Sequence, residues 1–280
     1  MKISFIVLTY NRTDALLAVL RSLARQCNDG HQVIIADDGS RQDQVQMLFD
    51  LCPVFNCPVL HVWHPDSGFT ISRARNLAAS HATGEYLVFL DGDCIPNRAF
   101  VAQHERIAQP GYFVNGSRVL LSHQLTSSVL DDALDLLIQP ANFWLRARLR
   151  GDSNKLVHLL GWPKNLFRVK KKFLWRGIRG CNLGVWKRDF INVNGFDESF
   201  EGWGHEDADF VLRLSHLGIQ RKNGFLATEV FHLWHPESKR DSESINKNRV
   251  MARLNSHLIL AEKGLRELKT STFIKFTQLH

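Results

Sequence analysis

The chain has 280 residues, of which 44% are hydrophobic and 22% charged, as in a globular protein of one large or two small domains. Its formal net charge of +7 is local, because residues 146–180 hold eleven Lys and Arg side chains against one Asp. No uninterrupted apolar run reaches membrane length, and the five scattered cysteines fit reduced thiols in a cytoplasmic protein better than a disulfide or zinc framework.

Strands and helices are predicted to alternate through the first hundred residues. Short apolar runs rich in β-branched residues predict strands at 3–9, 32–36, 58–63 and 86–90. Helical spacing of apolar residues predicts helices from Thr13, through Met47, and over 70–80. The first run is too short for a signal peptide, since Asn11 and Arg12 follow it directly. The alternation predicts an α/β fold with a mostly parallel, doubly wound sheet.

The rest of the chain is less regular. We expect a helix after residue 97, then strands near 112–114 and 117–121. Helical periodicity covers 131–149, interrupted at Pro140, and an amphipathic helix is expected over 254–268. A further helix begins at Glu206, and residues 194–197 have the composition of a turn.

Two acids follow the predicted strand 86–90. Asp91 and Asp93 are one residue apart, so an extended or turning backbone can aim both carboxylates at one cation. In open α/β sheets ligands bind beyond the carboxyl ends of the strands, and oxygen ligands suit Mg²⁺ or Mn²⁺. Taken alone, the pair is explained more simply by an Asp-Gly turn that ends a strand.

Two common nucleotide-binding motifs are missing. No Gly-x-Gly-x-x-Gly follows the first strand, and no Gly-x-x-x-x-Gly-Lys-Ser/Thr occurs anywhere. The chain is therefore neither an ordinary dinucleotide enzyme nor a P-loop protein. The first loop also lacks the glycines that a sugar-nucleotide pyrophosphorylase would need.

Four motifs follow one another through the first hundred residues: Val7-Leu-Thr-Tyr-Asn-Arg12, Ala36-Asp-Asp-Gly-Ser40, Ser72-Arg-Ala-Arg-Asn76 and Leu90-Asp-Gly-Asp93. In this order they resemble the motifs of family 2 glycosyltransferases of the GT-A fold. The resemblance implies that the first loop and the Asp after the second strand hold uridine, and that Asp-x-Asp holds a divalent metal on the donor diphosphate. It places in the nucleotide-sugar site Thr9, Tyr10 near the uracil, Arg12, Asp38 accepting from a ring N–H, Arg73 or Arg75 near base or phosphates, Asp91 and Gly92. Individually, the Asp38 turn and the two arginines also fit a plain turn and a solvated helix face.

A second acidic centre lies in residues 200–210. Glycines flank Trp203, and Glu206, Asp207 and Asp209 open a helix, where the macrodipole favours acids. Gly202-Trp-Gly-His-Glu-Asp207 resembles the Gly-Trp-Gly-x-Glu-Asp motif of β-1,4-galactosyltransferases and chondroitin-type polymerases. The resemblance implies that Asp207 is the catalytic base, that Glu206 contacts a sugar and that Trp203 is a platform for a sugar ring. Gly180 and Asn182 are expected to contact sugar hydroxyls.

Residues 229–236 supply two histidines as candidates for a third metal ligand. The resemblance favours His235, with His232 as the rival. Residues three apart on a strand face opposite sides, so only one of them is expected to point at the metal. Either histidine also fits an ordinary core or surface position.

The basic segment 146–179 carries interleaved aromatic residues and has three interpretations. It suits a solvated loop near the site, a nucleic-acid surface, or contact with an anionic membrane or polyanionic glycan. The last is favoured, because the other motifs indicate an enzyme acting on a sugar acceptor, and no nucleic-acid partner is expected.

Together these features predict one GT-A domain over 1–280. Residues 1–98 form a nucleotide-sugar half, 99–240 a metal and acceptor half, and 241–280 a helical tail. The predicted activity is inverting transfer of a hexose or N-acetylhexosamine from a UDP-sugar to a glycan or glycolipid hydroxyl, with Mn²⁺ or Mg²⁺ as cofactor. The expected setting is bacterial surface polysaccharide or lipopolysaccharide synthesis, in the cytoplasm or on the inner face of its membrane. The alternative is a non-catalytic basic protein that binds polyanions or nucleic acid through 146–179.

Overall fold

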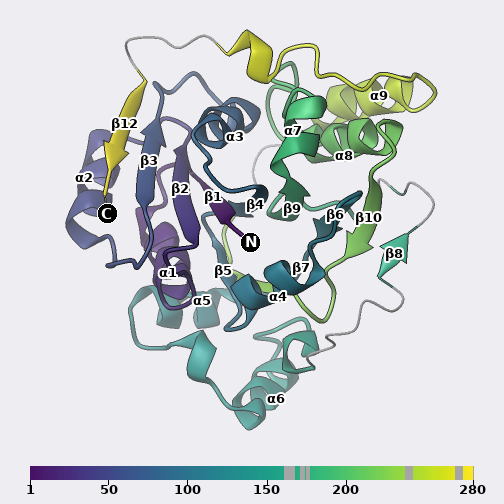
Figure 1. Cartoon of the computed structure of the whole chain (residues 1–280). Helices are drawn as coiled ribbons and strands as arrows, with labels where there is room; N and C mark the ends of the chain where they lie inside the picture. Colours follow the sequence, from purple (N-terminus) through teal and green to yellow (C-terminus); the bar gives the residue numbers. More distant parts are fainter. Residues whose placement is uncertain (161–167, 171–173, 175–176, 237–241, 269–273, 280) are drawn as a thin grey trace.

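A nine-stranded sheet forms the centre of the computed structural model (Figure 1), which describes residues 1–160, 168–170, 174, 177–236, 242–268 and 274–279. The strand order is β12-β3-β2-β1-β4-β9-β6-β10-β8. The strands are β1 (Ile3–Thr9), β2 (His31–Asp37), β3 (Val59–Trp63), β4 (Tyr86–Asp91), β6 (Tyr112–Asn115), β8 (Val169–Lys170), β9 (Asn182–Trp186), β10 (Gln220–Asn223) and β12 (Lys275–Gln278).

The predicted parallel sheet is confirmed for the first half of the chain, where β3, β2, β1 and β4 pair in parallel. Beyond β4 the described sheet is mixed, because β9 runs antiparallel to both β4 and β6. The edge strand β12 comes from the C-terminal tail and pairs antiparallel with β3. Strands from all three predicted segments thus share one sheet.

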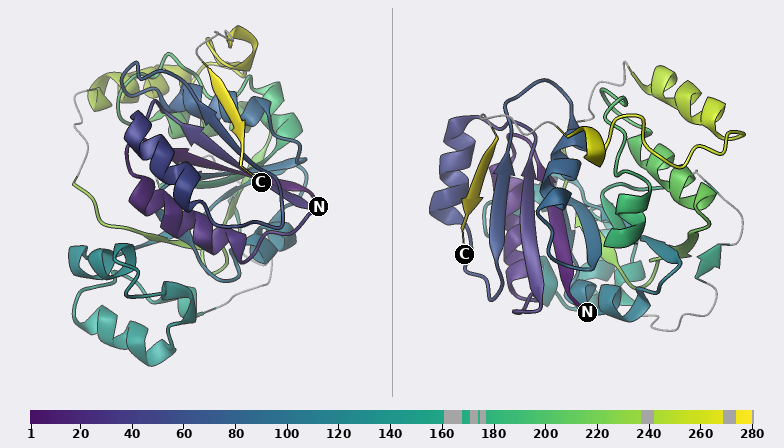
Figure 2. Two further views of the ribbon diagram at one scale, coloured as in Figure 1. Left: turned by 90° about the vertical axis from the view of Figure 1, so that its left-hand side faces the viewer. Right: turned by 45° about the horizontal axis from the view of Figure 1, so that its top comes forward.

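Helices cover both faces of the sheet (Figures 1 and 2). Along β1, Phe5 and Val7 belong to one core cluster and Ile6 to the other, and β2 and β4 alternate in the same way. Burial on both sides explains why these strands are continuous apolar runs. The helices are α1 (Thr13–Ala24), α2 (Gln42–Leu51), α3 (Ile71–Ser80), α4 (Phe100–Ile107), α5 (His123–Leu130), α6 (Ala141–Leu149), α7 (Lys187–Asn192), α8 (Glu206–His216) and α9 (Glu243–Arg253).

A second, three-stranded sheet joins segments that are far apart in the sequence. It consists of β5 (Cys94–Pro96), β11 (Glu229–His232) and β7 (Ser117–Leu120), in that order. Because β5 follows Asp93 directly, its pairing with β11 brings residues 232–235 to the end of β4. Neither β5 nor this pairing was predicted, since three-residue strands leave little periodicity.

Two helix predictions were wrong in their extent. Residues 131–149 are not one interrupted helix: a turn follows α5, then a short 3-10 turn at Leu136–Ile138, and α6 begins only after Pro140. The helix expected over 254–268 lies earlier, as α9, and 254–268 holds only a 3-10 turn at Leu265–Glu267. Within the described parts of the chain, no helix has the length and apolar character needed to span a membrane.

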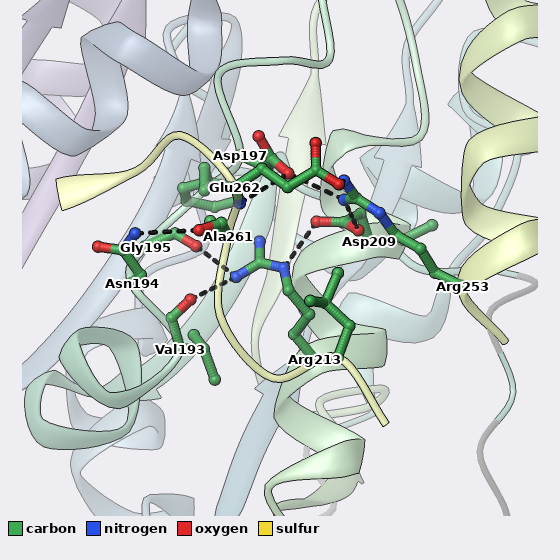
Figure 3. A network of polar contacts seen from close by, with 12 residues as sticks. Val193, Asn194, Gly195, Asp197, Asp209, Arg213, Arg253, Ala261 and Glu262 are labelled. Atoms are coloured by element: carbon green, nitrogen blue, oxygen red, sulfur yellow. Dashed lines mark hydrogen bonds and ion pairs between the residues drawn. The ribbon is translucent and has the colours of Figure 1, made fainter. Parts of the chain in front are cut away.

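A buried polar network fixes α8 against the tail (Figure 3). The Arg213 guanidinium donates to Asp209 and to the carbonyls of Val193 and Gly195. Arg253, at the end of α9, lies 2.9 Å from Asp197 and 2.6 Å from Asp209. The side chains of both acids are fully buried, so their charges depend on these arginines.

We expect Arg253→Ala to lower the free energy of unfolding by about 3 kcal/mol, because it leaves the buried Asp197 carboxylate without its cation. Urea unfolding followed by circular dichroism measures the change. Arg41→Ala is the matched control, since Arg41 pairs with Asp43 on the surface, where solvent screens the charges and the pair contributes little to stability. Equal losses in the two variants would contradict the prediction.

Candidate active site

A cavity of about 940 Å³ lies beyond the carboxyl ends of β1 and β4. Its wall combines the first loop, the ends of both sheets, the segment 177–181 before β9, and the start of α8. Most predicted site residues line it: Thr9, Tyr10, Arg12, Asp38, Arg75, Asp91, Gly92, Asp93, Gly180, Trp203, Glu206, Asp207, His232 and His235. The first acidic centre, Asp91 with Asp93, and the second, Glu206 with Asp207, therefore share one cavity.

The first acidic centre is a tight turn at the end of β4. The Gly92 N–H donates to the Leu8 carbonyl at 2.7 Å. A Cβ at Gly92 would lie 2.6 Å from that oxygen, so glycine permits the close approach of the turn to β1. This contact separates Asp91, which ends the strand, from Asp93, which reaches the second sheet.

Both candidate histidines lie against Asp93. His235 Nε2 is 3.3 Å from one Asp93 oxygen, and His232 Nε2 is 3.9 Å from the other. Both rings reach Asp93 because β11 ends at His232, so strand alternation does not extend to His235. Whether one or both would bind a metal stays a prediction. Burial lowers the pKa of His232, which favours its neutral form.

This donor set fits a divalent cation. His235 Nδ1 lies 2.8 Å from the Pro236 carbonyl, which can only accept, so Nδ1 is the donor there and Nε2 is the ring nitrogen that faces Asp93 and could bind a cation. Burial raises the pKa of Asp91, as does the nearby Asp93 carboxylate. Neutral imidazoles and crowded carboxylates are ligands that Mn²⁺ accepts.

Arg75 connects the first acidic centre to the second. Its guanidinium donates to Asp91 Oδ1 at 2.9 Å and to Glu206 Oε1 at 3.1 Å. The Arg75 side chain is only 2% exposed. Burial opposes its charge, but Asp91 and Glu206 outweigh that effect and raise the pKa of Arg75. A guanidinium offers a planar fork of donors, which suits simultaneous contact with two carboxylates.

The second acidic centre opens α8 after a loop of left-handed backbone. Gly202, Gly204 and His205 have φ angles of 73°, 98° and 71°. Such angles are ordinary for glycine but uncommon for histidine. They turn the chain sharply around Trp203, so that Trp203 and the first turn of α8 both line the cavity. Burial and the adjacent Asp207 carboxylate raise the pKa of Glu206 to about 7.

Two backbone N–H groups hold the Asp207 carboxylate. Gly180 donates to Oδ2 at 2.9 Å and Ala208 donates to Oδ1 at 2.7 Å. A Cβ at Gly180 would lie 3.3 Å from both Asp207 Cβ and an Arg75 nitrogen, so the site is closely packed there. Each carboxylate oxygen keeps a second lone pair for a proton or a ligand hydroxyl.

Tyr10 and Asp38, the residues predicted to contact the uracil, are held by their neighbours. The Tyr10 hydroxyl donates to Asp66 at 3.0 Å, and the Tyr10 side chain is 47% exposed. The Asp38 carboxylate accepts from the Thr70 N–H and hydroxyl, at 3.0 and 2.6 Å. Asp38 is therefore rigidly placed in the cavity wall, with part of its accepting capacity already used.

Two predicted site residues lie elsewhere. Asn182 is fully buried on β9, and its amide donates to the carbonyls of Ser117 and Thr228, so it braces the sheets and does not face the cavity. Arg73 does not line the cavity, because helical geometry sends residues two apart in different directions and Arg75 takes the inward position.

Some cavity residues were not predicted. Arg118 and Arg179 add positive charge to the wall, and Phe69 and Trp234 add aromatic faces. Arg179 adjoins the predicted Gly180, which is a signal in the sequence. Arg118 lies on the short β7 and has no motif around it. Only the pairing of β7 with β11 shows that it belongs here.

Two family models match the chain. Residues 4–132 match glycosyl transferase family 2, and residues 165–236 match a model described as the N-terminal domain of galactosyltransferase. Chondroitin synthase from Escherichia coli is 25% identical over 232 residues, covering 77% of this chain and 32% of that protein. The chain spans about a third to a half of the length of the first curated relatives it matches.

Solved structures agree on the fold. S. aureus TarS 1-349 in complex with UDP-GlcNAc has a TM-score of 0.59 at 17% identity, covering 95% of this chain and 69% of that one. The mannosyltransferase PcManGT from Pyrobaculum calidifontis, in complex with GDP-Man and Mn²⁺, has a TM-score of 0.53 at 15% identity, covering 90% and 62%. This likeness shows that the chain has the GT-A fold.

The four N-terminal motifs therefore lie within the part of the chain, residues 4–132, that matches glycosyltransferase family 2. The resemblance of the four N-terminal motifs is confirmed, and so is the prediction of an enzyme. The alternative of a non-catalytic polyanion-binding protein is set aside.

Proposed function

We propose that the chain is an inverting, metal-dependent transferase that moves a hexose or N-acetylhexosamine from a UDP-sugar to a hydroxyl of a glycan or glycolipid. One observation carries the proposal: Arg75 joins Asp91 of the first acidic centre to Glu206 of the second within one cavity. The complex of TarS with UDP-GlcNAc and the relationship to chondroitin synthase support the UDP-sugar donor and the glycan acceptor. The proposed setting is synthesis of a bacterial surface polysaccharide or lipopolysaccharide.

The donor is held by the wall that β1, β2 and α3 build. Tyr10 offers its ring to the uracil, and Asp38 accepts from the uracil ring N–H. Arg118 and Arg179 bring positive charge to the cavity and suit the diphosphate. Trp203 supplies an apolar face to a sugar ring, with Gly180 close enough for backbone contact.

Asp207 acts as the base. Its carboxylate is oriented by the N–H groups of Gly180 and Ala208 and accepts the proton of the acceptor hydroxyl. The acceptor oxygen then forms a bond to the anomeric carbon while the bond from that carbon to the UDP oxygen breaks. Attack on the face opposite UDP inverts the anomeric configuration, so an α-linked donor yields a β-linked product.

The metal would be held by Asp93 with His232 and His235, and by Asp91 on the strand side. When bound, a divalent cation neutralises the charge that grows on the departing diphosphate. The chain's own contribution is to keep Asp91 in place through Arg75 and to keep the His235 ring oriented through the Pro236 carbonyl.

A screen of UDP-sugars tests the proposal. Purified protein with Mn²⁺ is mixed with each donor, and released UDP is measured with and without acceptor oligosaccharides. We expect one or two donors to release UDP and an acceptor to accelerate the release. Absence of turnover with every UDP-sugar, alongside turnover with a GDP-sugar, would overturn the choice of donor.

Removal of the metal should remove activity. We expect EDTA to stop transfer and added Mn²⁺ to restore it, and we expect Asp93→Ala to lose activity by about a hundredfold or more, because Asp93 is the contact shared by both histidines. Isothermal titration with Mn²⁺ should show the same loss of binding in Asp93→Ala. Asp50→Ala, on exposed α2, is the control. Full activity in EDTA would exclude the metal.

Contact with an anionic membrane remains part of the proposal. In α6, which projects from the body of the molecule (Figure 2), Leu145 and Leu149 are 51% and 88% exposed beside the exposed Arg146, Arg148 and Arg150. Apolar and basic side chains on one exposed helix suit a surface of anionic lipids. The aromatic residues Trp162, Phe167, Phe173 and Trp175 of the basic segment lie outside the described residues.

A vesicle assay tests this contact. We expect the protein to sediment with phosphatidylglycerol vesicles and not with phosphatidylcholine vesicles at physiological salt. The variant Arg148→Gln/Leu149→Ser should lose about 2 kcal/mol of binding free energy, because it removes one exposed charge and one exposed apolar side chain from the lipid contact. Phe49→Ser, exposed on α2, is the control. If the protein stays free of both vesicles, the membrane contact fails.

A further inference from the structure

Cys94 lies within reach of the proposed metal ligands. It follows Asp93 directly, and its Sγ is 3.5 Å from Asp93 Oδ1. Ligand atoms of Asp93, Cys94 and His232 all lie within 4.8 Å of one another. Ligand atoms around a tetrahedral metal are about 3.3–3.8 Å apart, as follows from metal–ligand bonds of about 2.0–2.3 Å, so one sulfur–oxygen distance already matches a shared cation.

The fold, and not a chance rotamer, brings these groups together. In the antiparallel pairing of β5 with β11, Cys94 and His232 are direct partners, and such partners project from the same face of the sheet. The Leu233 N–H donates to the Asp93 carbonyl at 2.9 Å, which fixes the register at this end. Cys94 is fully buried, whereas Asp93 and His232 line the cavity, so an ion entering from the cavity meets Asp93 and His232 before the sulfur.

We propose that Cys94 is a further ligand at this centre, binding the metal as a thiolate together with Asp93, His232 and His235. The inference rests on the proposed metal dependence and adds to it the class of metal. Binding converts the thiol and M²⁺ into a metal thiolate and one proton, which leaves to solvent.

A sulfur ligand changes which metals the centre prefers. Carboxylates alone favour Mg²⁺ and Mn²⁺, whereas thiolate and imidazole favour Co²⁺, Zn²⁺ and Cd²⁺. The centre is therefore expected to bind Cd²⁺ and Zn²⁺ far more tightly than Mn²⁺. A substitution that removes only the sulfur should lower the affinity for Cd²⁺ much more than the affinity for Mn²⁺.

Cobalt spectroscopy tests the assignment without relying on activity. Metal-free protein is titrated with Co²⁺, and we expect a sulfur-to-cobalt charge-transfer band in the near ultraviolet that is absent in Cys94→Ser. Calorimetry with Cd²⁺ and Mn²⁺ should show that Cys94→Ser weakens Cd²⁺ binding by about tenfold or more beyond its effect on Mn²⁺. Cys52→Ser, a half-buried thiol outside the cavity, is the matched control.

Each outcome separates the inference from the proposed function. Cys181 also lines the cavity, so a band that persists in Cys94→Ser and disappears in Cys181→Ser would assign the sulfur to Cys181 and overturn the proposal. Cobalt binding without any sulfur band would overturn it too, while leaving the metal-dependent transferase intact. Failure to bind any of Co²⁺, Cd²⁺ and Mn²⁺ would contradict both the assignment of Cys94 and the proposed metal dependence. Circular dichroism of Cys94→Ser before titration confirms that the variant is folded.

Discussion

Asp207→Asn is expected to lower kcat by about a thousandfold while UDP binding changes little. The substitution keeps the size of the side chain and leaves an oxygen for one of the Gly180 and Ala208 N–H groups. It removes the carboxylate that is proposed to accept the acceptor's proton. Because Asp207 is on α8 and the residues proposed to bind uridine are on the loops after β1 and β2, donor affinity should be preserved. Single-turnover transfer and UDP titration measure the two quantities.

Glu206 is the rival base, and pH separates the two candidates. The pKa of Glu206 is raised to about 7, so a rate that depended on ionised Glu206 would rise with pH through about 7 and lose that rise in Glu206→Gln. With Asp207 as the base, Glu206→Gln keeps substantial turnover. Asp50→Asn, an exposed acid on α2, is the control for removal of an acid. Full turnover in Asp207→Asn together with loss in Glu206→Gln would exchange the roles.

The first half of the molecule could be predicted because local pattern and tertiary structure agree there. Strands β1, β2 and β4 are buried on both faces, so each is an uninterrupted apolar run, and each ends in a polar turn at the same edge of the sheet. Asp91 and Asp93 were found in this way. To predict their position, it was enough to know where one strand ends and that its neighbours run parallel to it.

The contacts between the first hundred residues and the residues after position 200 could not be predicted from local pattern. Contact between Arg75 and Glu206 spans 131 positions and depends on where α8 packs. The approach of His232 and His235 to Asp93 depends on the pairing of β5 with β11, strands of three and four residues that are too short to show a period. For Asn182 the local pattern was misleading. A polar residue close to Gly180 suggested contact with a ligand, but its amide donates hydrogen bonds to backbone carbonyls of the second sheet and its approach.

Arg75→Met should destabilise the protein by about 3–5 kcal/mol and abolish transfer, because it leaves the buried Glu206 carboxylate and the partly exposed Asp91 carboxylate without their cation. The loss of stability should depend on pH. An acid whose pKa is raised in the folded state takes up its proton on folding, so it costs stability as pH rises from its unfolded pKa through its folded pKa. Glu206, at about 7 with Arg75 present, moves higher without it. Urea unfolding at pH 5 and pH 8 should therefore show the larger loss at pH 8.

Two companion variants show whether the pairing or the volume of Arg75 matters. Arg75→Lys keeps one positive charge but cannot contact two carboxylates with a planar fork, so it should recover part of the stability and little activity. Arg75→Met/Glu206→Gln removes one of the two unpaired acids and should be more stable than Arg75→Met alone. If the double variant is no more stable, or if the deficit is equal at both pH values, Arg75 fills space between the two acidic centres and does not couple their charges.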